Sequence, residues 1–367
     1  MPKISVVVPV YNCEEFLDET FECILNQTFN DFEAIFVDDG STDDSLKILE
    51  DYALKDNRVS VYHQENSGGG VARNFAITKA QGKYIYFMDS DDLMDLNTLQ
   101  ATYDLIEKSN ADFLLFKSLN YNYAENKYHS VPYLSMDEIY EIVGDDVFHY
   151  SDVGDLIFDI SPTPWGKLYN KQFILDSHAE FGKTKAFHDN EFFWTALFSS
   201  KKIIFLNETL YSRRIHSNSI QQSHDKKFMD IIPVLDNIKN IFIKFNTLDD
   251  YKAKFYNWKI NITNVRFSQI HEEYKELFFK EFKQDLLKNV NAEGEEELKS
   301  MLNSSNKRIV DSMLNANTYN EYLLLMEISE LKSQIKKLKK KNRKLKKEKK
   351  ELKKSNDGFL DKVKSRF

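Results

Sequence analysis

The sequence predicts an α/β fold with a doubly wound, mostly parallel sheet, followed by a helical subdomain and a C-terminal coiled coil. In the first 120 residues, short apolar runs rich in β-branched side chains alternate with segments of helical spacing. Residues 226–322 have helical spacing throughout, and residues 324–352 follow a strict 4-3 repeat. Strands separated by helices of about 10–15 residues are typical of βαβ units, and hence of a parallel sheet.

The alternation within the first 120 residues specifies the elements in turn. The run Ile4–Val8 is interpreted as a buried strand, because it is apolar and rich in valine. Ser41 is a candidate N-cap for the second helix, and the glycines at 68–70 interrupt the chain before the third. The expected strands are residues 4–8, 32–37, 59–63, 84–88 and 112–116, and the expected helices are residues 14–27, 43–52, 97–108 and a segment that ends near Ala80.

The net formal charge of −8 is unevenly distributed along the chain. Residues 321–367 contain 17 basic and 7 acidic side chains, whereas the remainder contains 33 basic and 51 acidic ones. Because the body is acidic, nucleic acid is not expected as a partner. The chain has no secretory signal and no run of about 20 apolar residues, so we expect a cytoplasmic protein, at most peripheral to a membrane.

Polar side chains follow three of the expected strands. Tyr11-Asn12 comes after the first strand, Asp38-Asp39-Gly40 after the second, and Asp89-Ser90-Asp91-Asp92 after the fourth. In open parallel sheets, ligands bind beyond the carboxyl ends of the strands. We therefore expect the three clusters to form one site.

The acids after the fourth strand suit a divalent cation. Burying carboxylates without compensation is costly, and Mg²⁺ or Mn²⁺ is typically held by one or two carboxylates together with substrate phosphates. This favours a metal–diphosphate site at Asp89-x-Asp91. The alternative is N-capping of the next helix by Asp92 or Asp95, but a cap needs one acid and four occur here in seven residues.

The other two motifs suit a nucleotide. Acids such as Asp38-Asp39 at a strand end accept hydrogen bonds from a base or a ribose hydroxyl, although they are also candidate helix caps. The glycines at 68–70 permit close backbone approach at a helix start, where anions bind. A dinucleotide fingerprint would need its glycines where this chain has Pro9–Asn12, so a nicotinamide enzyme is disfavoured.

In combination, these motifs resemble glycosyltransferase family 2, which has the GT-A fold and includes enzymes of bacterial and archaeal surface polysaccharides. The resemblance covers about residues 3–220, and it rests on Val7–Asn12, Val37–Asp43, Gly68–Asn74 and Met88–Asp92 in this order. It implies transfer of a sugar from a nucleotide-diphosphate sugar, with UDP expected, to a hydroxyl of a glycan or lipid-linked acceptor. Mn²⁺ or Mg²⁺ is the implied cofactor.

The resemblance also implies roles on the donor side. Asp39 should contact the uracil, Asp89 should approach the ribose, and Asp91 should ligate the metal. Three further residues should line the nucleoside pocket, and two are candidates to hold the diphosphate. These are Pro9, Tyr11 and Arg73 for the nucleoside, and Arg214 and His216 for the diphosphate.

On the acceptor side, the family's base usually lies in a Glu-Asp pair, which corresponds here to His188-Asp189. Asp189 is then the expected base, with Glu191 as the fallback because His188 replaces the usual acid. Trp165 is a candidate to stack on the acceptor sugar, and a place in the core is its alternative role. One general base and a metal-stabilised leaving group are enough for direct displacement, which inverts the anomeric centre.

We divide the chain accordingly into four parts. Residues 1–225 form the GT-A domain, with a nucleotide-binding half at about 1–120 and an acceptor half at about 121–225. A helical subdomain follows at 226–320, then a basic coiled coil at 321–356 and a short amphipathic tail at 357–367. Two other functions stay open: a nucleotidyltransferase, and a non-catalytic scaffold on a transferase fold that acts through its coil.

The coil pattern predicts a parallel homodimer. Its d positions are all leucine, and its a positions include Ile328, Ile335 and Asn342, a combination that favours two parallel strands in fixed register. However, residues 332–354 contain 14 basic and two acidic side chains, so charge repulsion opposes pairing. Contact with an anionic membrane would relieve this repulsion, and Phe359 and Phe367 in the tail fit such a surface.

Overall fold

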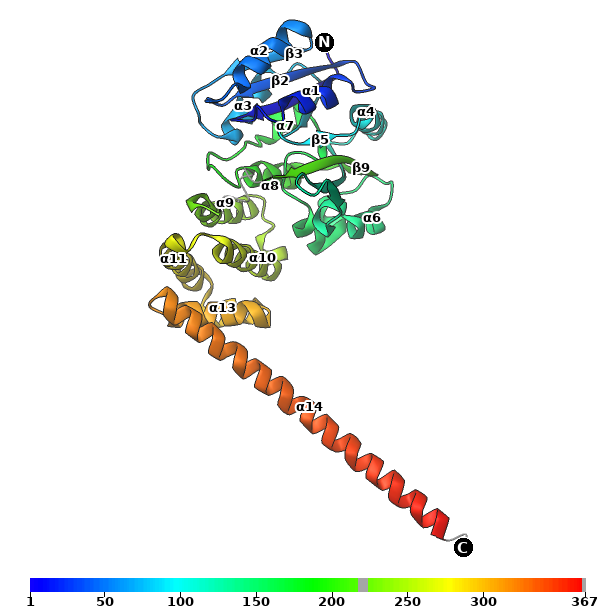
Figure 1. Ribbon diagram of the computed structural model, residues 1–367, viewed down its shortest axis with the longest axis vertical. Helices are drawn as coiled ribbons and strands as arrows, with labels where there is room; N and C mark the ends of the chain where they lie inside the picture. Colours follow the sequence, from blue (N-terminus) through cyan, green and yellow to red (C-terminus); the bar gives the residue numbers. More distant parts are fainter. Residues whose placement is uncertain (217–223, 365–367) are drawn as a thin grey trace. The chain divides into compact units, whose positions relative to one another are not determined.

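The computed structural model describes residues 1–216 and 224–364, with side chains up to Leu352. The chain divides into two compact units, Met1–Glu272 and Glu273–Phe367. Figure 1 shows the elements in chain order, from the blue N-terminal strands to the red C-terminal helix. The first unit contains the sheet, and the second is helical.

A mixed sheet forms the centre of the first unit. In the described part of the chain it has nine strands, in the order β3-β2-β1-β4-β8-β6-β9-β5, with β7 paired to β6. The strands are β1 Ile4–Val10, β2 Phe32–Asp38, β3 Val59–His63, β4 Tyr84–Phe87, β5 Leu93–Met94, β6 Phe113–Asn122, β7 Lys127–His129, β8 Lys167–Asn170 and β9 Ile203–Ile215.

The predicted α/β fold with a mostly parallel sheet is confirmed. Strands β1 to β4 pair in parallel, and β6 and β9 run in the same direction, whereas β5, β7 and β8 run the opposite way. Strand β6 does not pair with β4, because β8 lies antiparallel between them. The register matches Val10 with Asp38 and Val7 with Phe87, so the residues after β1, β2 and β4 lie at one edge.

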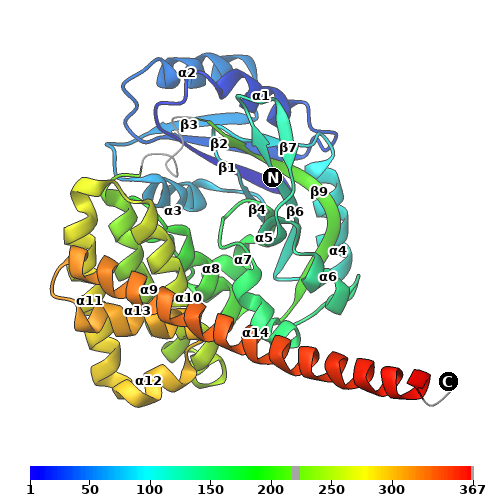
Figure 2. The same cartoon turned by 60° about the horizontal axis from the view of Figure 1, so that its bottom comes forward.

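Helices cover both faces of the parallel strands. Figure 2 shows α1 (Leu17–Leu25) and α2 (Ser45–Lys55) on one side of β1–β3, and α3 (Gly69–Lys79) on the other. Val6, Val8 and Val10 join one hydrophobic cluster, and Val7 between them is also fully buried. Burial on both faces explains why this strand is a continuous apolar run.

The remaining elements of the first unit surround the other strands. Two 3₁₀ segments, Tyr150–Asp159 and Lys226–Asp230, accompany the helices. The helices are α4 Thr98–Ser109, α5 Pro132–Ser135, α6 Asp137–Val143, α7 Lys171–Ser177, α8 Asp189–Ser199, α9 Ile231–Lys244 and α10 Leu248–Gln269.

The prediction that Ser41 caps the second helix is wrong. Helix α2 begins at Ser45, whose backbone N–H donates to Asp43 Oδ1 at 3.0 Å. The Ser41 hydroxyl instead accepts from the backbone N–H of Asn12 at 3.0 Å. Ser41 therefore joins the loop after β2 to the loop after β1.

The two compact units meet in sequence at Glu272–Glu273, whereas the sequence analysis placed a boundary after residue 225. Helices α9 and α10 belong to the first unit because aromatic side chains join them to α8. Phe242 of α9 lies 4.6 Å from Phe198 and 5.0 Å from Trp194, measured between ring centroids. Phe255 of α10 lies 5.1 Å from Phe242.

The second unit consists of four helices in its described part, α11 Lys275–Glu293, α12 Glu295–Met301, α13 Ser304–Asn315 and α14 Tyr319–Lys364. Helix α14 packs against α11 and α13 through its first turns. Tyr322 is 4% exposed and lies near Phe279, and Glu330 pairs with Arg308 of α13.

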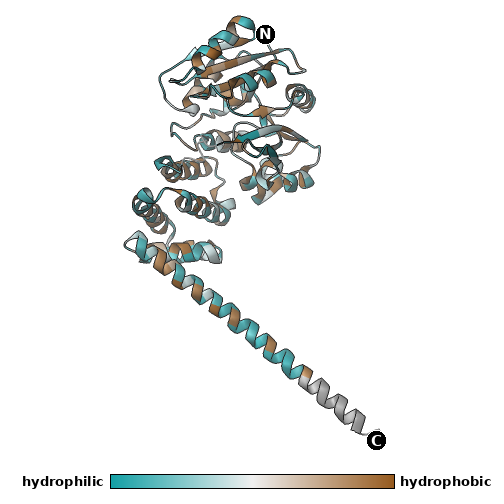
Figure 3. Ribbon diagram, viewed as in Figure 1, coloured by the Kyte–Doolittle hydropathy of each residue, from teal (hydrophilic) through white to brown (hydrophobic). Residues whose placement is uncertain are grey.

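The 4-3 repeat occupies a different face of α14. Leu324, Ile328 and Leu331 are between 38% and 56% exposed, whereas Tyr322, two residues before Leu324, is buried. Figure 3 shows this helix as mostly hydrophilic, with hydrophobic residues at intervals along it. Side chains from residue 353 onward, including Phe359 and Phe367 of the predicted tail, lie outside the described residues. In the part of the chain that is described, no helix is long and apolar enough to span a membrane.

Candidate active site

The loop after β2 is built around Asp39. Its backbone N–H donates to Val10 O at 2.8 Å, and its side chain is 3% exposed. The carboxylate accepts hydrogen bonds from the backbone N–H groups of Ser67 and Gly68, both at 2.8 Å, and from Gln64 at 2.7 Å. Asp39 thus fixes the loop that leads into α3. Of the two other residues expected at the nucleoside, Tyr11, directly after β1, is 51% exposed, and Pro9 on β1 is half-buried.

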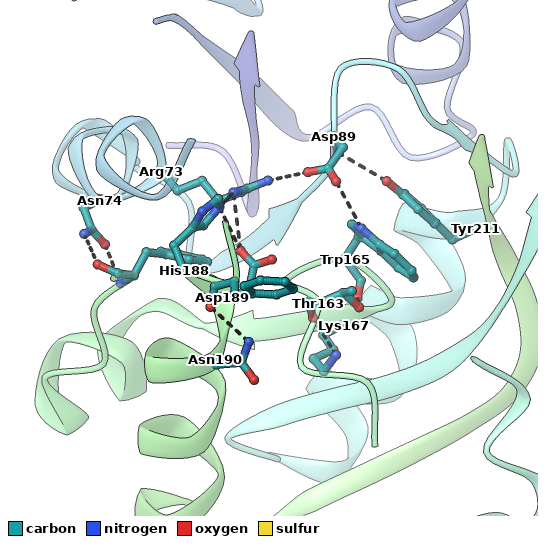
Figure 4. Close-up of polar contacts among 12 residues, drawn as sticks. Arg73, Asn74, Asp89, Thr163, Trp165, Lys167, His188, Asp189, Asn190 and Tyr211 are labelled. Atoms are coloured by element: carbon teal, nitrogen blue, oxygen red, sulfur yellow. Dashed lines mark hydrogen bonds and ion pairs between the residues drawn. The ribbon is translucent and has the colours of Figure 1, made fainter. Parts of the chain in front are cut away.

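Arg73 of α3 links two of the predicted acids. One terminal nitrogen pairs with Asp89 Oδ1, and the other lies 2.8 Å from His188 Nε2 and 3.5 Å from Asp189 Oδ1 (Figure 4). Burial lowers the pKa of Arg73, but Asp89 and Asp189 outweigh this effect and raise it. The guanidinium therefore stays charged between Asp89, which follows β4, and Asp189, the first residue of α8.

His188 completes this cluster as a neutral group. Burial lowers its pKa below the ordinary value, and Asp189 acts in the opposite direction. Because Nε2 faces the N–H of Arg73, the ring proton belongs on Nδ1. Arg73 is held closer to His188 than to Asp189, whose carboxylate is 24% exposed and lies 3.5 Å from Arg73 and 3.2 Å from His188 Nε2.

Trp165 supports Asp89 from the other side. Its indole N–H donates to Asp89 Oδ2 at 3.2 Å, and its ring stacks on Tyr211 with centroids 4.8 Å apart. The side chain is 4% exposed, so neither ring face is open for stacking on a sugar. Trp165 is therefore a core residue, the alternative given in the sequence analysis, and it also donates a hydrogen bond to Asp89 of the site.

Asp91 lies beside His216, as the predicted diphosphate site requires. His216 Nε2 is 2.8 Å from Asp91 Oδ2, and the Asp91 side chain is 29% exposed. Arg214 has a different place from the expected one. Its guanidinium is fully buried behind this segment, where it donates to Asp91 O at 2.7 Å and to Glu19 at 2.6 Å.

The acidic segment fits a divalent cation. Asp89, Asp91 and Asp92 each place a carboxylate oxygen within 4.8 Å of the others. However, Asp92 accepts from Tyr211 at 2.5 Å and from the Arg214 N–H at 2.7 Å, and Asp89 is bound by Arg73 and Trp165. Asp91 therefore has the most available oxygen. One carboxylate with substrate phosphates is a usual way for proteins to hold Mg²⁺ or Mn²⁺.

Glu191 lies two residues after Asp189 on α8, which points it to another side of the helix, and it has other partners. Its Oε1 accepts from Asn237 of α9 at 3.1 Å, and burial raises its pKa. A Cβ atom on Gly182 would lie 2.6 Å from Glu191 Oε2, so the carboxylate packs against that backbone. Of the two acids that the sequence analysis named as candidate bases, Asp189 is the one that lies in the Arg73 cluster.

The glycines at the start of α3 serve close packing within the protein. A Cβ atom at Gly70 would lie 2.5 Å from the Gly182 carbonyl oxygen and 3.1 Å from the His188 side chain. Gly68 has a φ of +97°, which side chains disfavour. These glycines therefore let the start of α3 approach the segment that carries Asp189.

Comparison with known proteins decides the family. The sequence model of the family described as Glycosyl transferase family 2 matches residues 5–158. The glycosyltransferase GlyG of Streptococcus pneumoniae serotype 4 is 32% identical over 296 residues, which are 76% of this chain and 94% of GlyG. The chain belongs to glycosyltransferase family 2.

Other relatives agree with this assignment. The putative glycosyltransferase EpsH of Bacillus subtilis is 30% identical over 69% of this chain and 73% of its own length. Residues 1–349 of S. aureus TarS, solved with UDP-GlcNAc, have the same fold, with a TM-score of 0.68, 22% identity and coverage of 89% of this chain and 90% of that TarS fragment. The GT-A fold is confirmed, and the chain is a glycosyltransferase.

Two supporting residues of this family 2 enzyme were not predicted. Asn74 joins α3 to the loop before α8, with two hydrogen bonds of 2.9 Å to the backbone of Phe181. Lys167 donates to the carbonyl oxygens of Ser161 and Thr163 at 2.8 and 2.7 Å, and burial lowers its pKa to about 7. Asn74 ends the motif Gly68–Asn74 of the sequence analysis, but its partner Phe181 lies 107 positions away in sequence.

Proposed function

We propose that the enzyme transfers a sugar from a UDP-sugar to a hydroxyl of a glycan or lipid-linked acceptor, with inversion. The observation that carries this proposal is the Arg73 cluster, which joins Asp89 at the strand edge to Asp189 at the start of α8. A donor held at the strand edge and a base on α8 are the two parts that direct displacement requires. UDP is proposed because TarS, which shares the fold, was solved with UDP-GlcNAc.

On the donor side, we assign the nucleoside to Asp39, Pro9, Tyr11 and Arg73, and the ribose to Asp89. The diphosphate would lie at His216 and Asp91, with Arg214 behind them. A Mn²⁺ or Mg²⁺ ion held by Asp91 would stabilise the negative charge of the leaving nucleoside diphosphate. The buried Arg214 supports this site by fixing the carbonyl of Asp91.

On the acceptor side, Asp189 would accept the hydroxyl proton as the bond to the anomeric carbon forms. Double displacement would need a second carboxylate as nucleophile. Glu191 faces Asn237 and Gly182, while Asp89 is bound by Arg73 and Trp165, so neither is free for that role. This supports a single displacement with inversion. An acceptor on the cytoplasmic side of a bacterial or archaeal envelope, in surface polysaccharide synthesis, fits this function.

A panel of nucleotide sugars with Mn²⁺ or Mg²⁺ tests the proposal. We expect one UDP-sugar to yield UDP, slowly with water and faster with a glycan acceptor, and chelation to stop the reaction. A nucleotidyltransferase would instead release pyrophosphate from a nucleoside triphosphate and a sugar phosphate. A scaffold would give no turnover with any donor, and either result would contradict the proposed activity.

We also propose that two chains pair in parallel through α14. The repeat residues Leu324, Ile328 and Leu331 are exposed, whereas packing within the unit uses another face, marked by the buried Tyr322. Asn342 falls at an a position, where its pairing with the same residue of a second copy sets the register. The basic side chains that flank the repeat would favour contact with anionic lipid.

For α14, Leu331→Gln should weaken dimerisation, whereas Leu323→Gln, at a similarly exposed position outside the repeat, should leave it unchanged. Sedimentation of the 43.2 kDa chain measures the dimer, which should strengthen with salt as lysine repulsion is screened. Flotation with anionic vesicles, with and without residues 323–367, tests the membrane contact. Equal behaviour of both leucine variants would contradict the dimer, and equal flotation would contradict lipid binding.

A further inference from the structure

The loop of residues 181–188 determines where Asp189 lies. It begins at Phe181 and ends directly before α8, and the Gly182 N–H closes it by donating to His188 O at 2.8 Å. Asp230 holds its outer part by accepting from the N–H groups of Lys185 and Ala186, at 3.1 and 3.2 Å. Phe181, where the loop begins, is a further point whose anchoring bears on the position of Asp189.

The side chain of Asn74 of α3 holds the Phe181 backbone. The Asn74 amide donates to the Phe181 carbonyl oxygen and accepts from the Phe181 N–H, each at 2.9 Å. This paired arrangement uses both functional groups of the amide, so no other natural side chain of that length reproduces it. Figure 4 shows Asn74 one residue from Arg73, facing the loop that leads to His188 and Asp189.

The Phe181 ring connects the same point to both sides of the site. It stacks on Phe192 of α8 with ring centroids 4.3 Å apart, and it meets Phe87 of β4 edge-on at 5.2 Å. The Arg73 guanidinium lies 5.5 Å from the ring centre. Phe87 precedes Asp89 by two residues, and Phe192 follows Asp189 by three. Phe181 thus lies between the strand that leads to Asp89 and the helix that begins with Asp189.

We propose that Asn74 is a positioning residue for Asp189. Through Phe181 it keeps the base at a fixed distance from Arg73 and Asp89, and so from the donor. It touches no reacting atom in this arrangement. The inference rests on the proposed function, because it concerns the transfer step of that same site.

The test compares Asn74→Ala and Asn74→Asp with wild type and with Asn170→Ala. Asn170 caps α7 through a hydrogen bond to the Phe173 N–H at 3.2 Å, so its loss is a comparable structural change away from Asp189. Displacement of a catalytic group by about 1 Å costs on the order of 100-fold in rate. We expect kcat of both Asn74 variants to fall about 10- to 100-fold, with KM for the donor changed less than about twofold. Asn170→Ala should retain wild-type kcat.

Asn74→Asp keeps the acceptor for the Phe181 N–H, so it remains available if Asn74→Ala does not fold. Amide hydrogen exchange at residues 181–182 gives a second readout that needs no turnover. We expect faster exchange there in both Asn74 variants and not in Asn170→Ala. Unchanged kcat with faster exchange, or a joint loss of donor affinity and kcat, would overturn the inference. Absence of turnover in wild type would contradict the proposed function instead. In that case amide exchange still tests the Asn74 contact, and unchanged exchange at residues 181–182 in both Asn74 variants would overturn it.

Discussion

Asp189→Asn is expected to lower the rate of sugar transfer about 10²- to 10⁴-fold, the usual contribution of a general base. The amide cannot accept the hydroxyl proton, although it preserves the shape of the side chain at the start of α8. Donor binding should persist, because the nucleotide is assigned to residues beyond the strand ends. Transfer kinetics and titration with UDP and Mn²⁺ measure the two effects separately.

Glu191→Gln is the matched control, since it makes the same carboxylate-to-amide change two residues further along α8. It should leave transfer within a few-fold of wild type, because Glu191 bonds to Asn237 and packs against Gly182. If Glu191→Gln abolished transfer and Asp189→Asn did not, the base would be Glu191. Normal transfer in both variants would leave the proposed mechanism without its proton acceptor.

Asp91→Asn should have the second large effect. We expect loss of the Mn²⁺-dependent thermal stabilisation by UDP, and a transfer rate lowered on the order of 10³-fold, because a metal supplies several kcal/mol to charge stabilisation at a leaving group. A neutral amide oxygen is a poorer ligand for a hard divalent cation than a carboxylate. Thermal shift with UDP, in Mn²⁺ and in chelator, measures the binding effect directly.

Asp95→Asn serves as the control for this substitution. Asp95 is an exposed acid on the same segment, outside the group of three carboxylates that could hold a cation. Its variant should keep the full Mn²⁺-dependent shift. A normal shift in Asp91→Asn would show that the metal, if required, is held elsewhere.

The edge of the sheet could be predicted because it follows from local patterns. Apolar runs specify β1, β2 and β4, and parallel strands must place the residues that follow them, among them Asp39 and Asp89, along one edge. Strand β8 could not be predicted in the same way. It has four residues, and its place between β4 and β6 depends on pairing with strands more than 50 residues away in sequence.

The side-chain roles that differed from expectation share a cause. Arg213 and Arg214 are neighbours on β9, and adjacent strand residues face opposite sides, so sequence alone does not tell which of them is buried. Trp165 bonds to Asp89 across 76 positions, and Asn74 bonds to Phe181 across 107. Spacing rules describe neighbours along a helix or strand, and they carry no information on such distant partners.

Helix α14 is continuous from its first turns, which pack within the helical unit, to the part whose repeat residues are exposed. Tyr322 is buried in the helical unit, and the first repeat residue, Leu324, comes two positions later on the same rigid helix. No flexible linker separates the two functions of this helix. If two chains pair along the repeat, their four-helix units must lie next to each other where the paired helices begin. The movement of each unit is then limited by steric contact with the other unit, and not by the length of a flexible linker.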